Sequence, residues 1–546
     1  MASHSTSKLK RLLFLAHRWL GIVLCAFFAM WFVSGVVMMY VGYPKLTEAE
    51  RLRRLPVLQA GQGLLPPAQA LAAAGLQAPL ASLRLAAASG GRPVYLAEPE
   101  REDGAEKKTP PGSGTVVIDA RSGARLASVG AAEALAAGRA WAGPDTGLRH
   151  LGTIMEDAFT HSRGLDGHRP LHRVQLDDPE HTLLYVSGRT GEVVRDAPRA
   201  ERWWNYAGAW IHWLYPFRGN AFDPYWADIV NWLSIAGIAM ALAGTVAGLL
   251  RWRSGRPYRS GSRSPYPGKT MRWHHIGGLL FALTTITWIF SGLMSMNPWR
   301  IFSGAAAPLR MEALAGGPPA LSPGVLSGAA PDALLAAAGA GVRELRWTRV
   351  LGQTLVLAYP AQGSPVVLDA AGARPAALDE KALAGAAGRL LPAPLLRIER
   401  LAAYDLHYYA RADHTMMGGS DKPLPVLRLV FDDAAASWVH LDPRTGAVLG
   451  RSDRHKRASR WLFAMLHSWD WLPLLERRPL WDLLLIVLSL GGAVMSVTGI
   501  VIGWRRLGRK LGRTLDHRPA HKPALRPAPS GGSGRPRLLP LDQAPH

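Results

Sequence analysis

The sequence is poor in cysteine and in nucleotide-binding motifs. Cys25 is the single cysteine in 546 residues, which excludes an intrachain disulfide. No C-x-x-C-H motif occurs, so covalent attachment of a c-type haem is excluded as well. Walker motifs and Gly-rich nucleotide fingerprints are also absent from the sequence, and the segments that we place in the cytoplasm below are too short for a flavin or nicotinamide domain.

Charge is nearly absent from four long apolar runs, at 19–41, 226–250, 274–296 and 481–504. Each meets the length of roughly 20 residues that a helix needs to cross a bilayer. The sequence therefore predicts an integral α-helical membrane protein with four transmembrane helices. The first run is longer than the core of a signal peptide and has no obvious cleavage site, so we interpret it as an uncleaved anchor.

Basic residues are concentrated in three short segments that alternate with the spans. Residues 1–18, 251–272 and 505–546 together carry +19 of the net charge of +23. Such bias places these segments on the cytoplasmic side through the positive-inside rule. The charge therefore indicates topology and contact with the lipid bilayer, and not nucleic-acid binding. Both termini are expected in the cytoplasm, with the long segments outside the membrane.

The remaining boundaries follow from this topology. They are a cytoplasmic N-terminus (1–18), a first outer region (42–202) with an interfacial helix (203–217), a basic loop (251–272), a second outer region (297–459) with an interfacial helix (460–473), and a disordered basic tail (505–546).

An internal repeat runs through the whole chain. A shift of 257 residues lays His17 over His274 and Ser34-Gly35 over Ser291-Gly292. A shift of 255 residues lays His212 over His467 and Trp226 over Trp481. Since one offset rarely survives by chance over such unlike residues, we interpret the chain as two parallel in–out–in repeats related about the membrane normal.

Short β-rich runs ending in a turn recur within the outer regions. The runs begin at Val116, Leu184, Val366 and Trp438, and each ends at a glycine. Ala/Leu-rich stretches at Pro67–Ala74 and Pro331–Ala340 are typical of amphipathic helices. The outer regions are therefore predicted to be small α+β modules, two in each half.

Histidines at the ends of the spans are the main candidates for chemistry. Because like residues of the two repeats meet about the axis, His17 pairs with His274 or its neighbour His275, and His212 pairs with His467. Facing imidazoles are what bis-histidine haem b ligation requires, so we predict two non-covalent haem b groups, one near each face. The alternative is that these histidines only anchor helices at the headgroup level.

Weaker candidates lie elsewhere. Asp405, His407, Tyr408 and Tyr409, with His414, could line a ligand site. His161, His168 and His172 fit no strong metal template, and Met38, Met39, Met294 and Met296 are more typical of apolar filling than of axial ligands.

The motif His17-Arg-Trp-Leu-Gly21, the pair Leu466-His467 and the Asp-x-x-x-Gly strand ends resemble the PepSY-associated transmembrane family over residues 10–507. The resemblance is strongest over Arg428–Trp504. It implies a multi-pass protein of a bacterial inner membrane whose long segments are PepSY-like periplasmic modules. It also implies iron regulation and similarity to siderophore-iron reductases with two b-type haems. One departure is Asp157-Ala-Phe-Thr-His161, where the second half has Asp405–Tyr409.

The paired histidines predict transmembrane di-haem electron transfer from a quinol or another donor. The resemblance implies that the acceptor is a ferric siderophore or similar chelate and that the chain acts as a haem-dependent ferric reductase. Two alternatives remain open. One is a non-enzymatic, membrane-tethered PepSY protein that regulates proteases. The other is a metal or siderophore transporter, against which stands the expectation of unbroken spans without buried charge.

Overall fold

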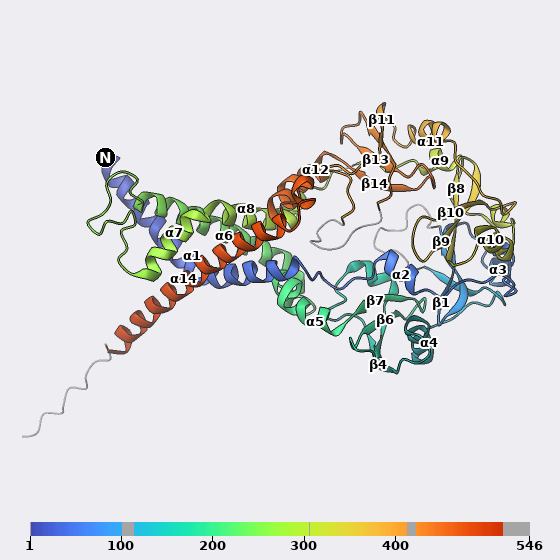
Figure 1. Ribbon diagram of the computed structural model, residues 1–546, viewed down its shortest axis with the longest axis horizontal. Coiled ribbons are helices and arrows are strands. Elements are labelled where there is room, and N and C mark those ends of the chain that lie inside the picture. Colours follow the sequence, from blue (N-terminus) through green and yellow to red (C-terminus); the bar gives the residue numbers. More distant parts are fainter. Residues whose placement is uncertain (1, 101–113, 305, 412–421, 517–546) are drawn as a thin grey trace, which may run out of the picture.

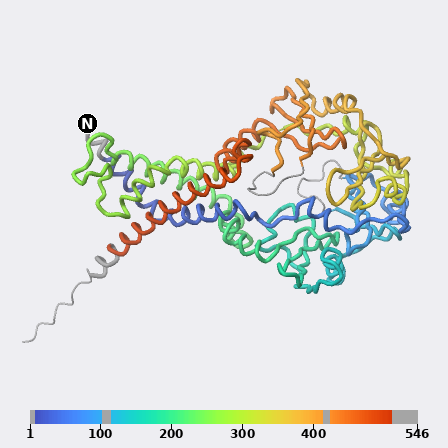
Figure 2. Tube along the Cα trace, in the orientation of Figure 1, coloured from blue at the N-terminus to red at the C-terminus, as the bar shows by residue number. Residues whose placement is uncertain are grey.

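The computed structural model describes residues 2–100, 114–304, 306–411 and 422–516, with side chains from residue 8 to residue 509. A bundle of long helices forms one end of the molecule, and a globular part with three β-sheets forms the other (Figure 1). The chain passes from the bundle into the globular part and back twice, so both described ends lie at the remote end of the bundle (Figure 2). The charge pattern predicts these two passages from the bundle into the globular part and back. That the end of the bundle with both termini faces the cytoplasm stays a prediction.

Three helices are long and apolar enough to cross a membrane: α1 (Ala2–Met38), α6 (Trp226–Arg251) and α14 (Leu480–Asp516). α1 packs against both of the others. The rings of Phe28 and Phe32 on α1 lie over Gly237 of α6 and Gly492 of α14, where a Cβ atom would crowd them. Glycines thus allow bulky rings to fill the core of the bundle while the helices stay close.

The third predicted span is not one straight helix. It consists of α7 (Lys269–Leu280) and α8 (Ala282–Ser295), which are bent by 64° at Phe281. The bend follows the pair Gly277-Gly278, and the Phe281 ring lies against Gly491 of α14 with no room for a Cβ. The expectation of unbroken spans is therefore wrong here, because a ring packs into the helix contact.

Two helices extend beyond the predicted limits. α1 begins at Ala2, well before residue 19, and α14 continues to Asp516, beyond residue 504. The tail predicted to be disordered from 505 thus begins as helix, since Arg, Lys and Leu favour helical backbone even where they face water. Residues 517–546 lie outside the described part of the chain.

A six-stranded sheet joins the two halves of the globular part. Its order is β10 (Val366–Asp369), β9 (Gln353–Pro360), β8 (Val342–Val350), β1 (Leu80–Ser89), β2 (Arg92–Pro99) and β3 (Val116–Asp119). The central pair is β1 and β8, which run antiparallel with Leu83 opposite Trp347. One three-stranded unit from each half therefore closes its edge against the other, which removes two exposed strand edges.

Two four-stranded antiparallel sheets complete the globular part. One is β4 (Leu148–Ile154), β5 (Leu171–Leu176), β6 (Leu183–Ser187) and β7 (Val193–Ala197). The other is β11 (Leu395–Leu401), β12 (Val426–Phe431), β13 (Trp438–Leu441) and β14 (Val448–Ser452). Helix α4 (Ala131–Ala142) covers the first and α11 (Glu380–Ala387) the second, each through buried alanine and leucine side chains.

The β-rich runs that the sequence marks are strands that end in tight turns. Gly123, Gly191 and Gly446 follow β3, β6 and β13 with φ near +72°, as a left-handed turn position requires. In the fourth turn this position is taken by Ala373, with φ +48°. The predicted helices α3 (Pro67–Ala73) and α10 (Pro331–Ala338) are also present.

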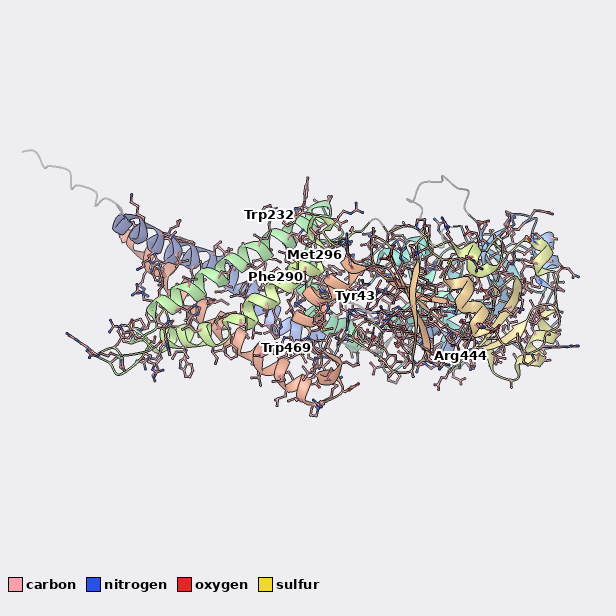
Figure 3. All side chains as sticks on the ribbon, turned by 90° about the horizontal axis from the view of Figure 1, so that it is seen from above. Tyr43, Trp232, Phe290, Met296, Arg444 and Trp469 are labelled. Atoms are coloured by element: carbon pink, nitrogen blue, oxygen red, sulfur yellow. The ribbon has the colours of Figure 1, made fainter. Side chains whose placement is uncertain are left out.

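Shorter segments connect these elements. The short α-helices are α2 (Glu48–Arg54), α5 (Arg199–Asn205), α9 (Met311–Ala315), α12 (Arg454–Arg460) and α13 (Leu472–Leu475). The π-helical turns are η2 (Tyr206–Trp210) and η7 (Trp461–Met465), and the 3-10 turns are η1 (Arg163–His168), η3 (Tyr215–Phe217), η4 (Asp223–Tyr225), η5 (Pro298–Arg300) and η6 (Pro323–Leu326). Tyr43, Met296 and Trp469 lie where the bundle meets the globular part (Figure 3).

Candidate functional site

Two pairs of histidines face each other, one near each end of the bundle. The ring centres of His17 and His274 are 6.2 Å apart, and those of His212 and His467 are also 6.2 Å apart. Two imidazoles that bind one metal ion from opposite sides, each through a bond of about 2 Å, have ring centres roughly 6 Å apart. The pairs that the repeat predicts are therefore neighbours in the fold, at the spacing of a shared metal ion.

Serine hydroxyls fix the proton on the rings of the pair next to the globular part. The Ser34 hydroxyl donates to the Met30 carbonyl at 2.6 Å, so it accepts the proton of His212 Nδ1 at 2.9 Å. In the other half the Ser291 hydroxyl donates to the Trp288 carbonyl at 3.0 Å and accepts from His467 Nδ1, also at 3.0 Å. Since Nδ1 carries the proton, the lone pair of each ring resides on Nε2.

Backbone carbonyls fix the other pair in the same way. His17 Nδ1 donates to the carbonyl of Met240 at 3.2 Å, and His274 Nδ1 donates to that of Met495 at 3.1 Å. Nε2 of these four rings has no hydrogen-bond partner among the described residues. A ring that donates through one nitrogen and keeps the other nitrogen bare is the arrangement of a metal-ligating histidine.

A glycine lies beside each of the four rings. Gly35 lies beside His212 and Gly292 beside His467. A Cβ atom at these glycines would lie 3.7 Å from Cε1 of His212 and 3.8 Å from Cε1 of His467. At the other pair the room is tighter, since a Cβ at Gly244 would stand 2.5 Å from Cε1 of His17. Each imidazole ring therefore lies close to a neighbouring helix because the residue beside it is glycine. This explains why the repeat keeps a glycine at these positions.

A π-helical turn precedes each histidine at the globular end. η2 and η7 begin 255 residues apart, as do His212 and His467 that follow them. Such wide turns often redirect side chains at functional sites. The indole of Trp226 donates to the carbonyl of Trp213 at 2.8 Å, and that of Trp481 donates to the carbonyl of Ser468 at 3.0 Å. Each span is thereby fastened to the residue just after its histidine.

Burial keeps the rings of this pair neutral. His212 and His467 lie in the chain segments that precede α6 and α14, outside the membrane-spanning helices. Burial, and for His212 also the nearby His467, lowers the pKa of His212 to about 3, and burial lowers the pKa of His467 to about 4. Neutral imidazole is the form that binds metal ions.

His275 is not a member of either pair. Its Nε2 is 2.9 Å from the carbonyl of Gly248, and its Nδ1 is 2.8 Å from the hydroxyl of Ser264 in the basic loop. Both ring nitrogens are engaged, so the alternative pairing of His17 with His275 is replaced by the pairing with His274. Its role is to attach the basic loop to α6 and α7.

The histidines at the globular end line a large cavity, which also reaches Phe28 and Phe32 between the helices of the bundle. Its volume is about 1030 Å³, and its lining runs from His212 and His467 to His407, Tyr408 and Tyr409. Asp405 supports this far wall from behind, since it accepts the backbone NH groups of His407 and Tyr408 and pairs with Arg428 at 2.7 Å. The predicted ligand-site residues and the histidine pair therefore belong to one cavity; His414 lies outside the described residues.

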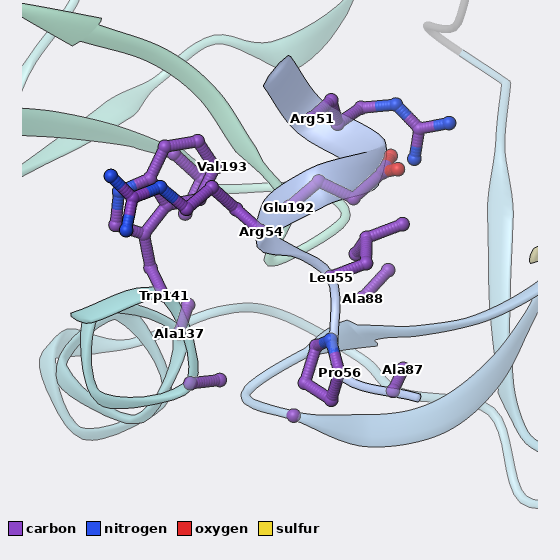
Figure 4. Close-up of a pocket in the computed structure, with 12 residues that line it drawn as sticks. Arg51, Arg54, Leu55, Pro56, Ala87, Ala88, Ala137, Trp141, Glu192 and Val193 are labelled. Carbon is purple, nitrogen blue, oxygen red and sulfur yellow. The ribbon is translucent and has the colours of Figure 1, made fainter. Parts of the chain in front are cut away.

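The cavity drawn in Figure 4 is of another kind. It lies between α2, β1 and α4, beside Trp141 and Glu192, and its volume is about 20 Å³. That space suits about one water molecule and no larger ligand.

The other histidines of the first outer region do not form a metal site. His161 bonds to Glu156 at 2.5 Å, His168 to Ser187 at 3.3 Å, and His172 to His150 at 3.2 Å. Within the part of the chain that is described, no group of three metal-binding side chains comes together. Met38, Met39 and Met296 line the large cavity, and Met294 is buried.

The family model of the PepSY-associated TM region matches residues 14–418 of the chain. The chain belongs to this family. This PepSY-associated protein is accordingly a multi-pass membrane protein. No curated protein matches it. The family match ends before Arg428–Trp504, so the prediction that the resemblance is strongest there stays untested.

The main residues that the sequence did not assign are Ser34 and Ser291. The repeat aligns them, but the alignment alone gives these serines no partner. The sequence does contain a signal for them, because a serine and a histidine recur in both halves near the same end of the predicted spans. Pairing them required the fold, because 178 residues separate Ser34 from His212.

Proposed function

We propose that this PepSY-associated protein carries electrons across the membrane through two haem b groups, and that it reduces a ferric chelate on the periplasmic side. The observation that carries the proposal is the pair of 6.2 Å ring spacings with Nδ1 donating and Nε2 bare in all four histidines. A bound haem would supply one-electron redox chemistry at each pair.

The bundle provides the remaining parts of the path. Ser34 follows His17 by seventeen positions along α1, which corresponds to roughly 25 Å along the helix. Phe28 and Phe32 fill the core between these levels, and the Phe32 ring contacts Trp288 at 5.9 Å. These rings form an apolar layer between the levels of the two pairs, and they close the large cavity on the side of His17 and His274.

The large cavity provides the space for an acceptor above His212 and His467. One electron converts the Fe³⁺ of the chelate to Fe²⁺, which hard oxygen ligands hold less tightly, so iron is released. The electron donor is a quinol or another reductant at the His17 side. Under this proposal the protein is a ferric-siderophore or ferric-chelate reductase.

The proposal is tested on the purified full-length protein. Oxidised and dithionite-reduced spectra, with a pyridine haemochrome assay, should give two haem b groups per chain. His274→Ala should remove one group and His467→Ala the other, whereas the control His150→Ala, on β4 of a remote sheet, should keep both. A wild-type protein without a Soret band contradicts the proposal.

The bend between α7 and α8 favours a second candidate, a transporter for a metal or siderophore. Interrupted helices at membrane depth are common in carriers. Uptake of the ferric chelate into protein-loaded vesicles without any reductant would favour transport. If all four ligand histidines can become alanine with no loss of function, a non-enzymatic interaction protein is favoured instead.

A further inference from the structure

The wall of the large cavity above His212 and His467 is rich in cations. Its lining includes the basic residues Lys422, Arg451, Lys456, Arg457 and Arg460 and the acids Asp453 and Asp470. Asp470 is already paired with Arg411 at 2.7 Å and with Arg460 at 3.1 Å. Asp453 caps α12 by accepting the backbone NH of Lys456. The acids are thus engaged within the protein, and positive charge predominates in the cavity.

Most of this positive charge has no counterpart in the first half of the chain. The residues 255 positions earlier are Asp196 for Arg451, Glu201 for Lys456, Arg202 for Arg457 and Asn205 for Arg460. α5 and α12, which carry most of these positions, begin 255 residues apart and have equal lengths. Three of the four positions thus hold an acidic or neutral residue in the first half, so the cations at 451, 456 and 460 are not needed to build the element.

Membrane topology does not account for these cations either. The segments that set the orientation, among them the loop 251–272, lie at the opposite end of the bundle. Basic residues at the end that carries the globular part run against the trend of the positive-inside rule. We therefore attribute these cations to what the cavity binds.

Aromatic rings lie among the cations. The Nζ atom of Lys422 lies 5.2 Å from the ring centre of Tyr409 and 5.8 Å from that of Tyr408. Tyr408 stacks on His440 at 4.9 Å. Flat polarisable faces beside ammonium and guanidinium groups suit an anion that also has apolar surface.

We propose that the cavity selects ferric chelates that carry net negative charge over neutral or cationic ones. This inference rests on the proposed function for its redox step. One electron passes to the Fe³⁺ of the chelate, giving Fe²⁺ with no proton taken up, so the chelate becomes more negative by one unit. Cations around the chelate stabilise that product more than the substrate, and thus favour the transfer as well as binding.

Charge selectivity can be measured without any redox step. Redox-inert gallium(III)–EDTA, an anion, is titrated into the full-length protein by calorimetry, in parallel with the uncharged gallium complex of a trihydroxamate. The wild type should bind the anion more tightly, and added salt should weaken only that binding. Lys456→Gln should lower the affinity for gallium(III)–EDTA about fivefold, as expected for one unit charge lost at a partly screened site. The double variant Lys422→Gln/Lys456→Gln should lower this affinity more.

The matched control is Lys381→Gln on α11, an exposed lysine outside the cavity lining. It should leave both affinities unchanged. The same variants are then reduced and mixed with iron(III)–EDTA in a stopped-flow instrument, where the rate of haem reoxidation should follow the affinities.

Three results would overturn the inference. One is equal affinity of the wild type for the charged and the uncharged complex. Another is an unchanged affinity for the anion in the double variant. A third is loss of haem from Lys456→Gln, since the cations would then serve the carboxylates of the cofactor. Absence of haem from the wild type would contradict the proposed function, whereas the gallium titration would still decide charge selectivity.

Discussion

Each histidine of the two pairs is held by a hydrogen-bond acceptor and a glycine on a neighbouring helix. The acceptor is a serine hydroxyl at His212 and His467 and a main-chain carbonyl at His17 and His274. Both kinds leave Nε2 as the basic nitrogen, and both orient the ring before any metal binds. Such second partners raise the basicity of the ligand and reduce the cost of ordering it.

Removal of the serine hydroxyls should weaken cofactor binding at the globular end. In Ser34→Ala and Ser291→Ala the Nδ1 proton of the histidine loses the serine acceptor, and His467 keeps only the longer contact with the Trp288 carbonyl at 3.2 Å, so each ring is held less firmly in its orientation. We expect haem affinity at this pair to fall by about 10- to 100-fold. Haem transfer to apomyoglobin measures the loss. Thr287→Ala, which removes an exposed hydroxyl of α8, is the control and should have no effect.

A methyl group at the glycine beside His17 should abolish the other site. In Gly244→Ala the new Cβ would stand 2.5 Å from the imidazole of His17, which has to move. The expected product binds one haem per chain, and the pyridine haemochrome assay measures this. Gly277→Ala on α7, where a Cβ meets nothing within 4 Å, should keep two. Equal haem content in both variants would contradict the assignment of this site.

Matching elements repeat in the two halves, yet they are not equivalent in detail. η2 and η7 and the turns after β3, β6, β10 and β13 recur, but α1 is continuous whereas α7 and α8 are bent by 64°. One turn also differs, because Ala373 occupies a left-handed position where Gly123 and Gly446 stand in others. An L-residue with a side chain is strained in that backbone conformation.

The strain at Ala373 predicts a stabilising substitution. Ala373→Gly relieves the Cβ contact at φ +48° and should raise the free energy of unfolding by up to about 1 kcal/mol. Thermal unfolding of the detergent-solubilised protein measures it. The control is Ala371→Gly in the same turn, where φ is not positive and no strain is relieved. This change only raises the chain entropy of the unfolded state, so it should lower the stability of the protein slightly. If Ala373→Gly lowers the midpoint, the turn is not strained there.

The whole molecule is held together by contacts between its halves. β1 and β8 pair at the centre of the shared sheet, and the fully buried Glu344 of β8 binds Arg51 of α2 at 2.8 Å and Arg84 of β1 at 3.2 Å. Charges buried in this way are stable only when they are paired. The ion pairs therefore fix the register of the two halves, and with it the position of their spans.

Neutralising Glu344 should separate the halves. Glu344→Gln leaves Arg51 and Arg84 without their shared carboxylate and should cost about 3–5 kcal/mol of stability. Denaturation of the full-length protein by guanidinium measures the loss. Glu380→Gln, whose ion pair with Arg400 is exposed, is the control and should change stability by less than about 1 kcal/mol.

The same carboxylate predicts acid sensitivity. Burial opposes ionisation of Glu344, but Arg51, Arg84 and Arg346 outweigh it and lower its pKa below the usual 4.5. Because the folded state prefers the ionised form, its stabilisation is complete above the ordinary pKa and is lost as the pH falls below 4.5. Midpoints measured from pH 7 to pH 3 should fall more steeply in the wild type than in Glu344→Gln.

The sequence by itself determined the features that depend on neighbouring residues and on the repeat. Apolar length predicted the spans and turn residues predicted the strand ends. Equal offsets predicted that His17 faces His274 or His275 and that His212 faces His467. Each of these is a pattern along the chain, so it can be found before the chain folds.

Only the tertiary structure decided which group each ring meets. It selected His274 over His275, matched the serines to the histidines, joined β1 to β8 and gathered Tyr408 and Arg460 above His467. It also bent α7 against α8, because the Phe281 ring packs on Gly491 of a distant helix. Such contacts join residues far apart in the chain, and packing, which no local pattern encodes, selects them.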